Sequence, residues 1–284
     1  MERTEGVVAI DGKTLRGAIA KTGRFPFVHI VSAFARANGV VLGQLRTSEK
    51  SNEITAIPRL IESLMLSGAV VTIDAAGCHN AIMDGIVEAE ADFVIGVKLN
   101  QPTLHEDMSV AFHEVDLGRT TATRAETEGQ GHGRGEHRRA EVLTANGLLS
   151  DPAKWEHVGS LIRLTTERFH NGKATESTRY YVSSISELTP ERALALVREH
   201  WSIENRLHWC LDVQFREDEC RCRAENLAEN LVVVRHVALN LLRQAKKMRG
   251  GIDGRRMKCC YSDAAREAVL AGTSVKHAIA LIPA

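Results

Sequence analysis

The chain has 284 residues, of which 44% are hydrophobic and 25% charged, a composition that lets a globular protein bury a large core in one or two domains. The sequence shows neither the charged and apolar segments of a secretory signal nor an apolar run of membrane-spanning length, so we expect no signal peptide and no membrane. Basic and acidic residues balance at 36 each, and zero net charge by itself argues against a nucleic-acid partner.

The distribution of charge along the chain points the other way. Residues 1–118 carry 10 basic and 15 acidic residues, whereas residues 119–284 carry 26 and 21. Seven basic residues and one acid fall within residues 243–258. Such a block is either a solvated helix end or a surface for phosphates.

The first hundred residues predict three strands in hairpin succession, followed by alternating helices and strands. Asn38 and Gly39 are a turn signal between two of the strands, and Pro58 marks a kink or a later start of the first helix. This order describes a mixed sheet flanked by helices. The expected strands are 7–10, 27–37, 40–47, 69–73 and 92–98, and the expected helices are 51–66 and 79–90.

Two of these strands are followed by an aspartate. Asp11 comes after the apolar run 7–10, and Asp74 comes after the run 69–73. Both are therefore expected at the carboxyl ends of strands, where ligands gather in an open α/β sheet. Each aspartate could instead be a helix cap or a turn residue.

Residues 198–218 predict a helix with one apolar stripe and an acid at its rim. Glu204 lies at the edge of the stripe, with His208 and Asp212 one and two turns further on. A solvated glutamate is the simpler interpretation, although two tryptophans and two histidines surround this one. Carboxylates that meet at one sheet edge repel unless a cation lies between them, and all-oxygen ligation suits Mg²⁺ or Mn²⁺. The stripe consists of Ile203, Leu207, Cys210 and Leu211.

Between the helix expected to end near Val115 and the segment 198–218, the pattern favours long strands. The glycine-rich segment 129–139 is either a phosphate-binding loop or a flexible turn. Trp155 is favoured as a core anchor over a platform for a displaced base. The expected strands are 120–128, 137–144, 161–169 and 174–183, with a hairpin turn at 170–173.

A further amphipathic helix is expected after the segment 198–218. Its predicted apolar stripe is Leu227, Leu231, Val234, Ala238 and Leu241, and residues 263–282 are expected to be helical with a weaker pattern. Basic side chains on and beyond this helix are left for solvent or DNA, so DNA affinity is expected mainly after residue 119 and with strong salt dependence. The DNA-binding candidates are Lys13, Arg235, Arg243, Lys246, Lys247 and Arg249.

Three segments, IDGKTLRG (10–17), TIDAAGCHN (72–80) and REHWSIENRLHWCLDVQFRED (198–218), resemble the catalytic blocks of bacterial insertion-sequence DDE transposases of the ISAs family. Four more fit in the same order: EKSNEI (49–54), VKLNQ (97–101), HGRGEHR (132–138) and AENLVVVRHVALNLL (228–242). Two departures stand out. His79 replaces a glutamine common in relatives, and His200 replaces the arginine of a Tyr-Arg-Glu-Lys signature whose lysine has no match.

The resemblance implies a ribonuclease-H-like fold with a β-rich insertion between the second and third catalytic acids. It assigns Asp11, Asp74 and Glu204 as the triad that binds Mg²⁺ or Mn²⁺, with two ions expected. Asn205, His208 and Asp212 are then candidates for orienting the carboxylate of Glu204.

The implied activity is metal-dependent DNA cleavage at the ends of an insertion sequence and strand transfer into target DNA. The implied partners are double-stranded DNA and further copies of the chain, in the bacterial cytoplasm near the nucleoid, with no nucleotide cofactor. A nuclease of the same fold and a non-catalytic DNA-binding remnant remain open alternatives.

The resemblance also suggests a division of the chain. We expect the first part of the core at 1–115, the insertion at 116–188, the catalytic helix with the rest of the core at 189–250, and a basic helical tail at 251–284. Relatives carry a helical region before the first catalytic strand, where this chain has six residues. We therefore expect little preference for terminal-repeat DNA.

Overall fold

The computed structural model describes residues 6–18, 28–47, 53–131, 134–170, 173–222, 224 and 226–271. The chain divides into two compact units, each built from two stretches of sequence. Unit 1 comprises residues 1–7 and 66–200, and unit 2 comprises residues 8–65 and 201–284. Among the described helices, none combines the length and apolar character needed to cross a bilayer. The four-part division expected from the sequence stays a prediction.

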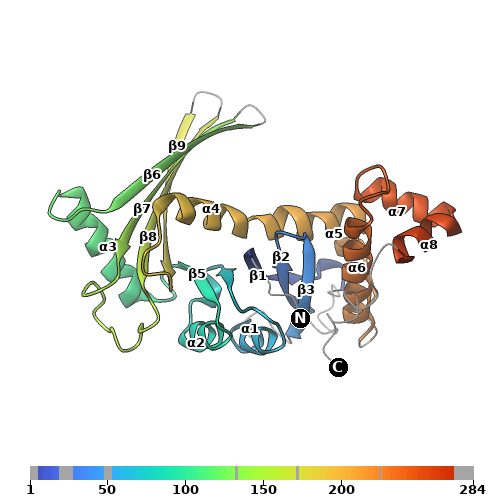
Figure 1. Ribbon diagram of the computed structural model, residues 1–284, viewed down its shortest axis with the longest axis horizontal. Helices are drawn as coiled ribbons and strands as arrows, with labels where there is room; N and C mark the ends of the chain where they lie inside the picture. Colours follow the sequence, from blue (N-terminus) through green and yellow to red (C-terminus); the bar gives the residue numbers. More distant parts are fainter. Residues whose placement is uncertain are drawn as a thin grey trace. The chain divides into compact units, whose positions relative to one another are not determined.

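Unit 2 contains an antiparallel sheet with β2 (His29–Ala35) in the centre (Figure 1). Its other strands are β3 (Val40–Thr47) and β1 (Gly6–Thr14), which belongs to unit 2 from Val8 onward. The predicted hairpin is confirmed, and Gly39 in its turn has a positive φ of 65°, which glycine adopts at little cost. The predicted position of Asp11 at the end of a strand is wrong. β1 continues to Thr14 because its pairing with β2 continues, with Asp11 opposite Ser32.

The described helices of unit 2 are α1 (Glu53–Glu62), α5 (Trp209–Gln214), α6 (Leu227–Gln244), α7 (Ile252–Tyr261) and α8 (Asp263–Ala271), with the short turns η1 (Arg16–Ala18), η4 (Glu204–His208) and η5 (Glu217–Glu219). Helix α1, the segment from η4 to α5 and helix α6 pack on this sheet, whereas α7 and α8 pack on α6. The predicted apolar stripe is confirmed: Ile203, Leu207, Cys210 and Leu211 are buried against Ala9, Phe34, Val41 and Leu239. Pro58 lies inside the first helix.

Helix α6 forms as expected, but its buried face is not the predicted one. Asn240 fixes the rotation of the helix, because its side-chain amide exchanges two hydrogen bonds of 2.9 Å with the backbone of Val41 in β3. This rotation leaves Leu227 and Val234 44% and 61% exposed and places a histidine, His236, in the core. The buried face consists of Ala228, Val232, His236, Leu239 and Leu242.

Unit 1 contains a six-stranded mixed sheet in the order β4-β5-β9-β8-β7-β6. β4 and β5 are parallel, and the other neighbours are antiparallel. All four strands predicted for the insertion form, whereas the turn at 171–172 lies outside the described residues. The elements are β4 (Ala69–Ile73), β5 (Asp92–Val97), β6 (Thr123–Gly131), β7 (Arg134–Thr144), β8 (Ser160–His170), β9 (Lys173–Ser183), η3 (Ala75–Gly77), α2 (Asn80–Glu88), α3 (Pro102–Asp116) and α4 (Pro190–His200).

The four long strands β6 to β9 form a sheet with two distinct faces. We call the face with the even-numbered residues 136–142 of β7 and their direct partners the Arg138 face, and the opposite one the Arg139 face. The lower part of the Arg138 face packs on α4 through Ala140, Val142, Ile162 and Leu164, and the strands extend well beyond that helix (Figure 1). Trp155 is 3% exposed, so its interpretation as a core anchor is confirmed.

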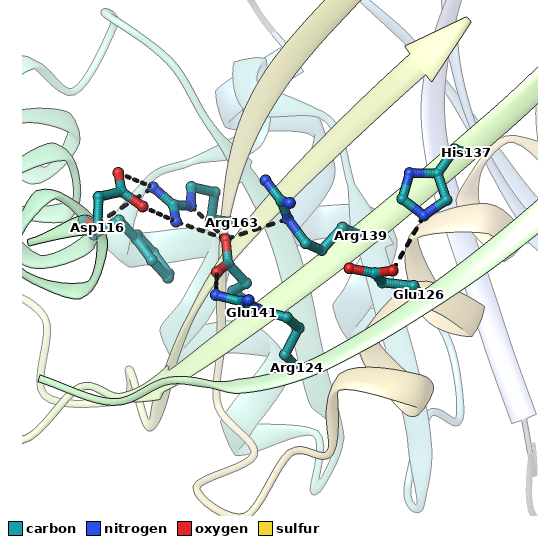
Figure 2. Close-up of polar contacts among 8 residues, drawn as sticks. Asp116, Arg124, Glu126, His137, Arg139, Glu141 and Arg163 are labelled. Atoms are coloured by element: carbon teal, nitrogen blue, oxygen red, sulfur yellow. Dashed lines mark hydrogen bonds and ion pairs between the residues drawn. The ribbon is translucent and has the colours of Figure 1, made fainter. Parts of the chain in front are cut away.

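The Arg139 face packs on α3 through an ion network centred on buried Glu141 and Arg163 (Figure 2). Arg163 donates to both carboxylate oxygens of Asp116, at 2.7 and 2.8 Å, and to Glu141 at 2.7 Å. Arg124 also donates to Glu141, whose side chain is 1% exposed, at 2.7 Å. The hydrogen bonds to Arg163 lower the pKa of Asp116. A buried charge is tolerated only when it is paired in this way.

Candidate active site

In unit 2, strand β1 and the helical segment from η4 to α5 are joined by two polar contacts. His208 Nε2 lies 3.2 Å from Asp11 Oδ2, and Lys13 Nζ lies 2.7 Å from Asp212 Oδ1. The strand residues are two apart and the helix residues four apart, and both spacings put side chains on one face about 6–7 Å apart. These contacts hold the first predicted acid against the helix that carries the third.

Glu204 begins a single π-helical turn, η4, in which the Trp209 N–H donates to the Glu204 carbonyl. Its side chain is exposed, and Glu204 precedes His208 by about one turn of this wider helix. π-helical turns insert one extra residue and occur frequently at functional sites. The π-helical turn therefore places the Glu204 side chain outside the core, where it is accessible to a ligand.

The side chains expected to orient Glu204 have other contacts in the structure. The ring of His208 is 9% exposed and lies against Asp11, and Asp212 lies against Lys13. The Asn205 side chain donates to the Trp201 carbonyl at 3.2 Å. Of the three, His208 thus contacts a predicted catalytic acid, but it is Asp11 and not Glu204.

Lys13, a DNA-binding candidate from the sequence, is held by acids of the same unit. Besides Asp212, its ammonium lies 3.0 Å from Asp218 and 3.8 Å from Glu217, and its side chain is 12% exposed. Burial lowers the pKa of Lys13, but the hydrogen bonds to Asp212 and Asp218 outweigh it, so the pKa is raised. Lys13 therefore remains charged and anchors the segment after α5.

Glu217 links this cluster to α6. Its side chain is 1% exposed and lies 3.7 Å from Arg235. Burial raises the pKa of the Glu217 carboxyl, although the charges of Lys13 and Arg235 oppose that shift. Arg235, a second DNA-binding candidate, thus has an internal ion-pair partner.

Arg243, another DNA-binding candidate, also has internal partners. Its guanidinium donates to the carbonyls of Gly39 and Arg206 and lies over the ring of Phe34 at 5.2 Å from the centroid. Burial lowers its pKa. The remaining candidates, Lys246, Lys247 and Arg249, are exposed and stay predictions.

Two glycines of the motif IDGKTLRG are required by close contacts. A Cβ on Gly12 would lie 2.4 Å from Glu53 Oε1 and from His29 Nε2, two buried groups that lie 2.5 Å apart. A Cβ on Gly17 would lie 2.5 Å from the carbonyl oxygens of Asp218 and Cys220. The motif therefore allows both β1 and η1 to pack closely against neighbouring groups near Asp11. No sequence signal identified Glu53 as buried.

In unit 1, Asp74 directly follows β4, as predicted. It accepts a hydrogen bond of 3.0 Å from the Ala76 N–H and caps η3, and its side chain is exposed. The interpretation of Asp74 as a cap is thus confirmed. This role does not conflict with catalysis, since one carboxylate can bind both an N–H group and a metal ion.

The turn after Asp74 is held by two side-chain amides of the segment VKLNQ (97–101), for which the sequence had suggested no individual role. Asn100 donates to the Ala75 carbonyl at 2.7 Å, and Gln101 donates to the Cys78 carbonyl at 2.8 Å. Both residues follow β5, the parallel neighbour of β4. Their position after β5 could have predicted that they lie near Asp74, because parallel strands end at the same edge of a sheet.

The three predicted acids are divided between the units, with Asp74 in unit 1 and Asp11 and Glu204 in unit 2. Among the residues that the structure describes, no group of three or more His, Cys, Asp or Glu side chains forms a ready metal site. Convergence of the triad therefore stays a prediction.

Comparison with known proteins identifies the family. Residues 2–241 match the family described as "Transposase DDE domain", and the chain belongs to this family. It is 40% identical to "Putative transposase YncI" of Escherichia coli O157:H7 over 278 residues, covering 96% of this chain and 71% of that protein. It is 36% identical over 274 residues to "H repeat-associated putative transposase YhhI" of Escherichia coli K12, covering 95% and 72%.

Proposed function

We propose that this chain is an insertion-sequence transposase of the ISAs type, in which Asp11, Asp74 and Glu204 form the catalytic triad on a ribonuclease-H-like fold. Family membership supports the transposase class. The observation that carries the residue assignment is the pair of contacts between β1 and the η4–α5 segment, since they hold Asp11 against the helix that bears Glu204.

The donor groups fit a hard divalent cation. Carboxylate oxygens are preferred ligands of Mg²⁺ and Mn²⁺, Asp74 and Glu204 are exposed, and the side chain of Asp11 is 19% exposed. When bound, such ions lower the pKa of water and stabilise a leaving 3′-oxygen. The fit rests on the chemistry of the donors.

The residues around the acids position them for this chemistry. His208 orients the Asp11 carboxylate, the ion pair of Lys13 with Asp212 keeps β1 and the helix in step, and the amides of Asn100 and Gln101 hold the turn after Asp74. A water molecule, and then a freed 3′-hydroxyl, would attack a phosphodiester of double-stranded DNA. One oxygen replaces another on phosphorus, so neither a covalent protein–DNA intermediate nor a nucleotide is required.

The test compares Asp11→Asn, Asp74→Asn and Glu204→Gln with the wild type on labelled DNA that carries the repeats flanking the source locus. Asparagine still caps a helix, so Asp74→Asn removes charge while preserving the turn. Each variant should lose Mg²⁺-dependent cleavage, and stabilisation by Mn²⁺ in thermal unfolding should weaken. Glu219→Gln, at an acid whose side chain is 72% exposed, is the control and should behave as the wild type.

The products separate the alternatives. Joined products in target DNA support a transposase, whereas nicking without joining identifies a nuclease that shares the fold. Full cleavage by any of the three variants would refute the assignment of that acid.

A further inference from the structure

The two faces of the β6–β9 sheet differ in charge. Direct partners in antiparallel strands point to the same face, so the hydrogen-bonded register assigns each described side chain to a face. Among the described side chains of these strands, the Arg138 face carries four basic residues and one acid, and the Arg139 face carries three and five. The Arg138 face has Arg138, Arg168, Lys173, Arg179 and Glu136; the Arg139 face has Arg124, Arg139, Arg163, Glu126, Glu128, Glu141, Glu167 and Glu176.

The acid on the Arg138 face does not neutralise it. Glu136 is shared by Arg138 at 2.6 Å and Arg168 at 3.0 Å. One carboxylate between two guanidinium groups leaves net positive charge, to which Lys173 adds, whereas Arg179 pairs with Leu164 lower on the face. On the opposite face, the arginines are used internally, since Arg124 and Arg163 both bind buried Glu141.

The upper part of the Arg138 face, which lies beyond Ala140 and Leu164 and includes Arg138, Arg168 and Lys173, is also chemically suited to phosphates. Thr127, Thr175 and Ser177 lie on it between the basic side chains, and hydroxyls as well as guanidinium groups commonly contact phosphate oxygens. Helix α4 covers the apolar lower part of the face and leaves the charged part beyond it.

We propose that the upper Arg138 face of β6–β9 binds the phosphate backbone of duplex DNA, and that the Arg139 face does not contact it. This inference rests on the proposed function, which supplies DNA as the partner, and it adds which face of the insertion binds the duplex. Contacts to phosphates carry no sequence information, so the binding should be independent of sequence and should weaken steeply with salt.

The sheet offers a closely matched pair of double variants. Arg138→Gln with Arg168→Gln removes side chains that are 28% and 54% exposed and share Glu136. The control, Arg139→Gln with Arg124→Gln, removes side chains that are 34% and 53% exposed and share Glu141. Glu141 keeps Arg163 as a partner in the control. Both variants lose the same charge from the same sheet, on opposite faces.

Binding to a duplex of arbitrary sequence is measured by fluorescence anisotropy over a series of salt concentrations, in the absence of divalent metal. Each phosphate contact that Arg138→Gln or Arg168→Gln removes should flatten the salt slope by about 0.9. The ratio of the variant Kd to the wild-type Kd should therefore be roughly eightfold larger at 0.1 M salt than at 1 M salt. The control should keep the wild-type slope. Circular dichroism establishes that both variants are folded.

A gain of affinity tests the same proposal without loss of a contact. Glu136→Gln removes the acid of the Arg138 face and should tighten binding, whereas Glu167→Gln on the other face should not. Equal effects of the two double variants, or tighter binding by Glu167→Gln alone, would overturn the proposal while leaving the transposase function intact. A wild-type chain that binds no DNA would overturn both.

Discussion

Buried His236 makes the stability of unit 2 dependent on pH. Burial, reinforced by nearby positive charges, lowers the pKa of His236 from 6.5 to about 3, so the ring is neutral in the folded protein. The unfolded chain takes up a proton as the pH falls below 6.5, and the folded protein does not do so until about pH 3. This contribution to stability is therefore fully present above pH 6.5 and is lost progressively as the pH falls towards 3.

The size of the effect follows from the shift. Each pH unit below 6.5 costs about 1.4 kcal/mol, so His236 alone should remove about 2 kcal/mol of unfolding free energy at pH 5. Replacement by leucine, which suits a stripe otherwise made of Ala228, Val232, Leu239 and Leu242, deletes the titrating group.

Urea unfolding of the wild type and His236→Leu at pH 7.5 and pH 5.0 measures the difference. The wild type should lose about 2 kcal/mol more than the variant between the two pH values. If both proteins lose the same amount, the ring is either hydrated or already protonated in the folded state, and the reasoning from its burial is refuted.

Three further predictions concern Gly12 in β1, the side-chain amide of Asn100 and the exposed basic residues after α6. Gly12→Ala should destabilise unit 2 by about 1–3 kcal/mol through its clash with buried Glu53 and His29, whereas Gly254→Ala, which meets no atom within 4 Å, should be neutral or slightly stabilising in α7; equal urea midpoints would contradict this. Asn100→Ala should slow cleavage more than it weakens DNA binding, because it frees the turn after Asp74; an unchanged rate would show that the turn holds without the amide. Replacing exposed Lys246, Lys247 and Arg249 together by glutamine should weaken DNA binding for any sequence and flatten its salt slope. An unchanged slope would exclude these three residues as a DNA-binding surface.

Most elements were predictable from periodicity and turn signals, because the cores of both units are apolar and regularly spaced. The hairpin at Gly39, the buried strand before Asp74 and the apolar stripe beginning at Ile203 are confirmed. Strand β1 was predicted too short, since the polar residues from Asp11 to Thr14 have no apolar alternation although they pair fully with β2.

The errors arise where polar side chains serve the interior. His236 occupies a core position, although hydrophobicity favours Val234 and Ala238 on either side of it. The buried face of α6 was therefore predicted on the wrong side of the helix. Lys13 and Arg243 look like surface charges in a sequence, and only the fold shows that their partners are acids or carbonyls distant along the chain. The π-helical turn at Glu204 was not predicted, because the stripe from Ile203 to Leu211 also fits the spacing of an ordinary α-helix.

The buried position of Glu141 has a consequence for how the long hairpins assemble. The upper parts of β7 and β8 are polar on both faces, and a shift of two residues keeps every side chain on its own side, so hydrophobicity hardly distinguishes one alignment from the next. Glu141 does, because a shifted strand would carry its carboxylate away from Arg163 and leave a buried charge alone, at a cost of about 3–5 kcal/mol. The network in Figure 2 thus makes the native alignment of these strands more stable than alignments shifted by two residues.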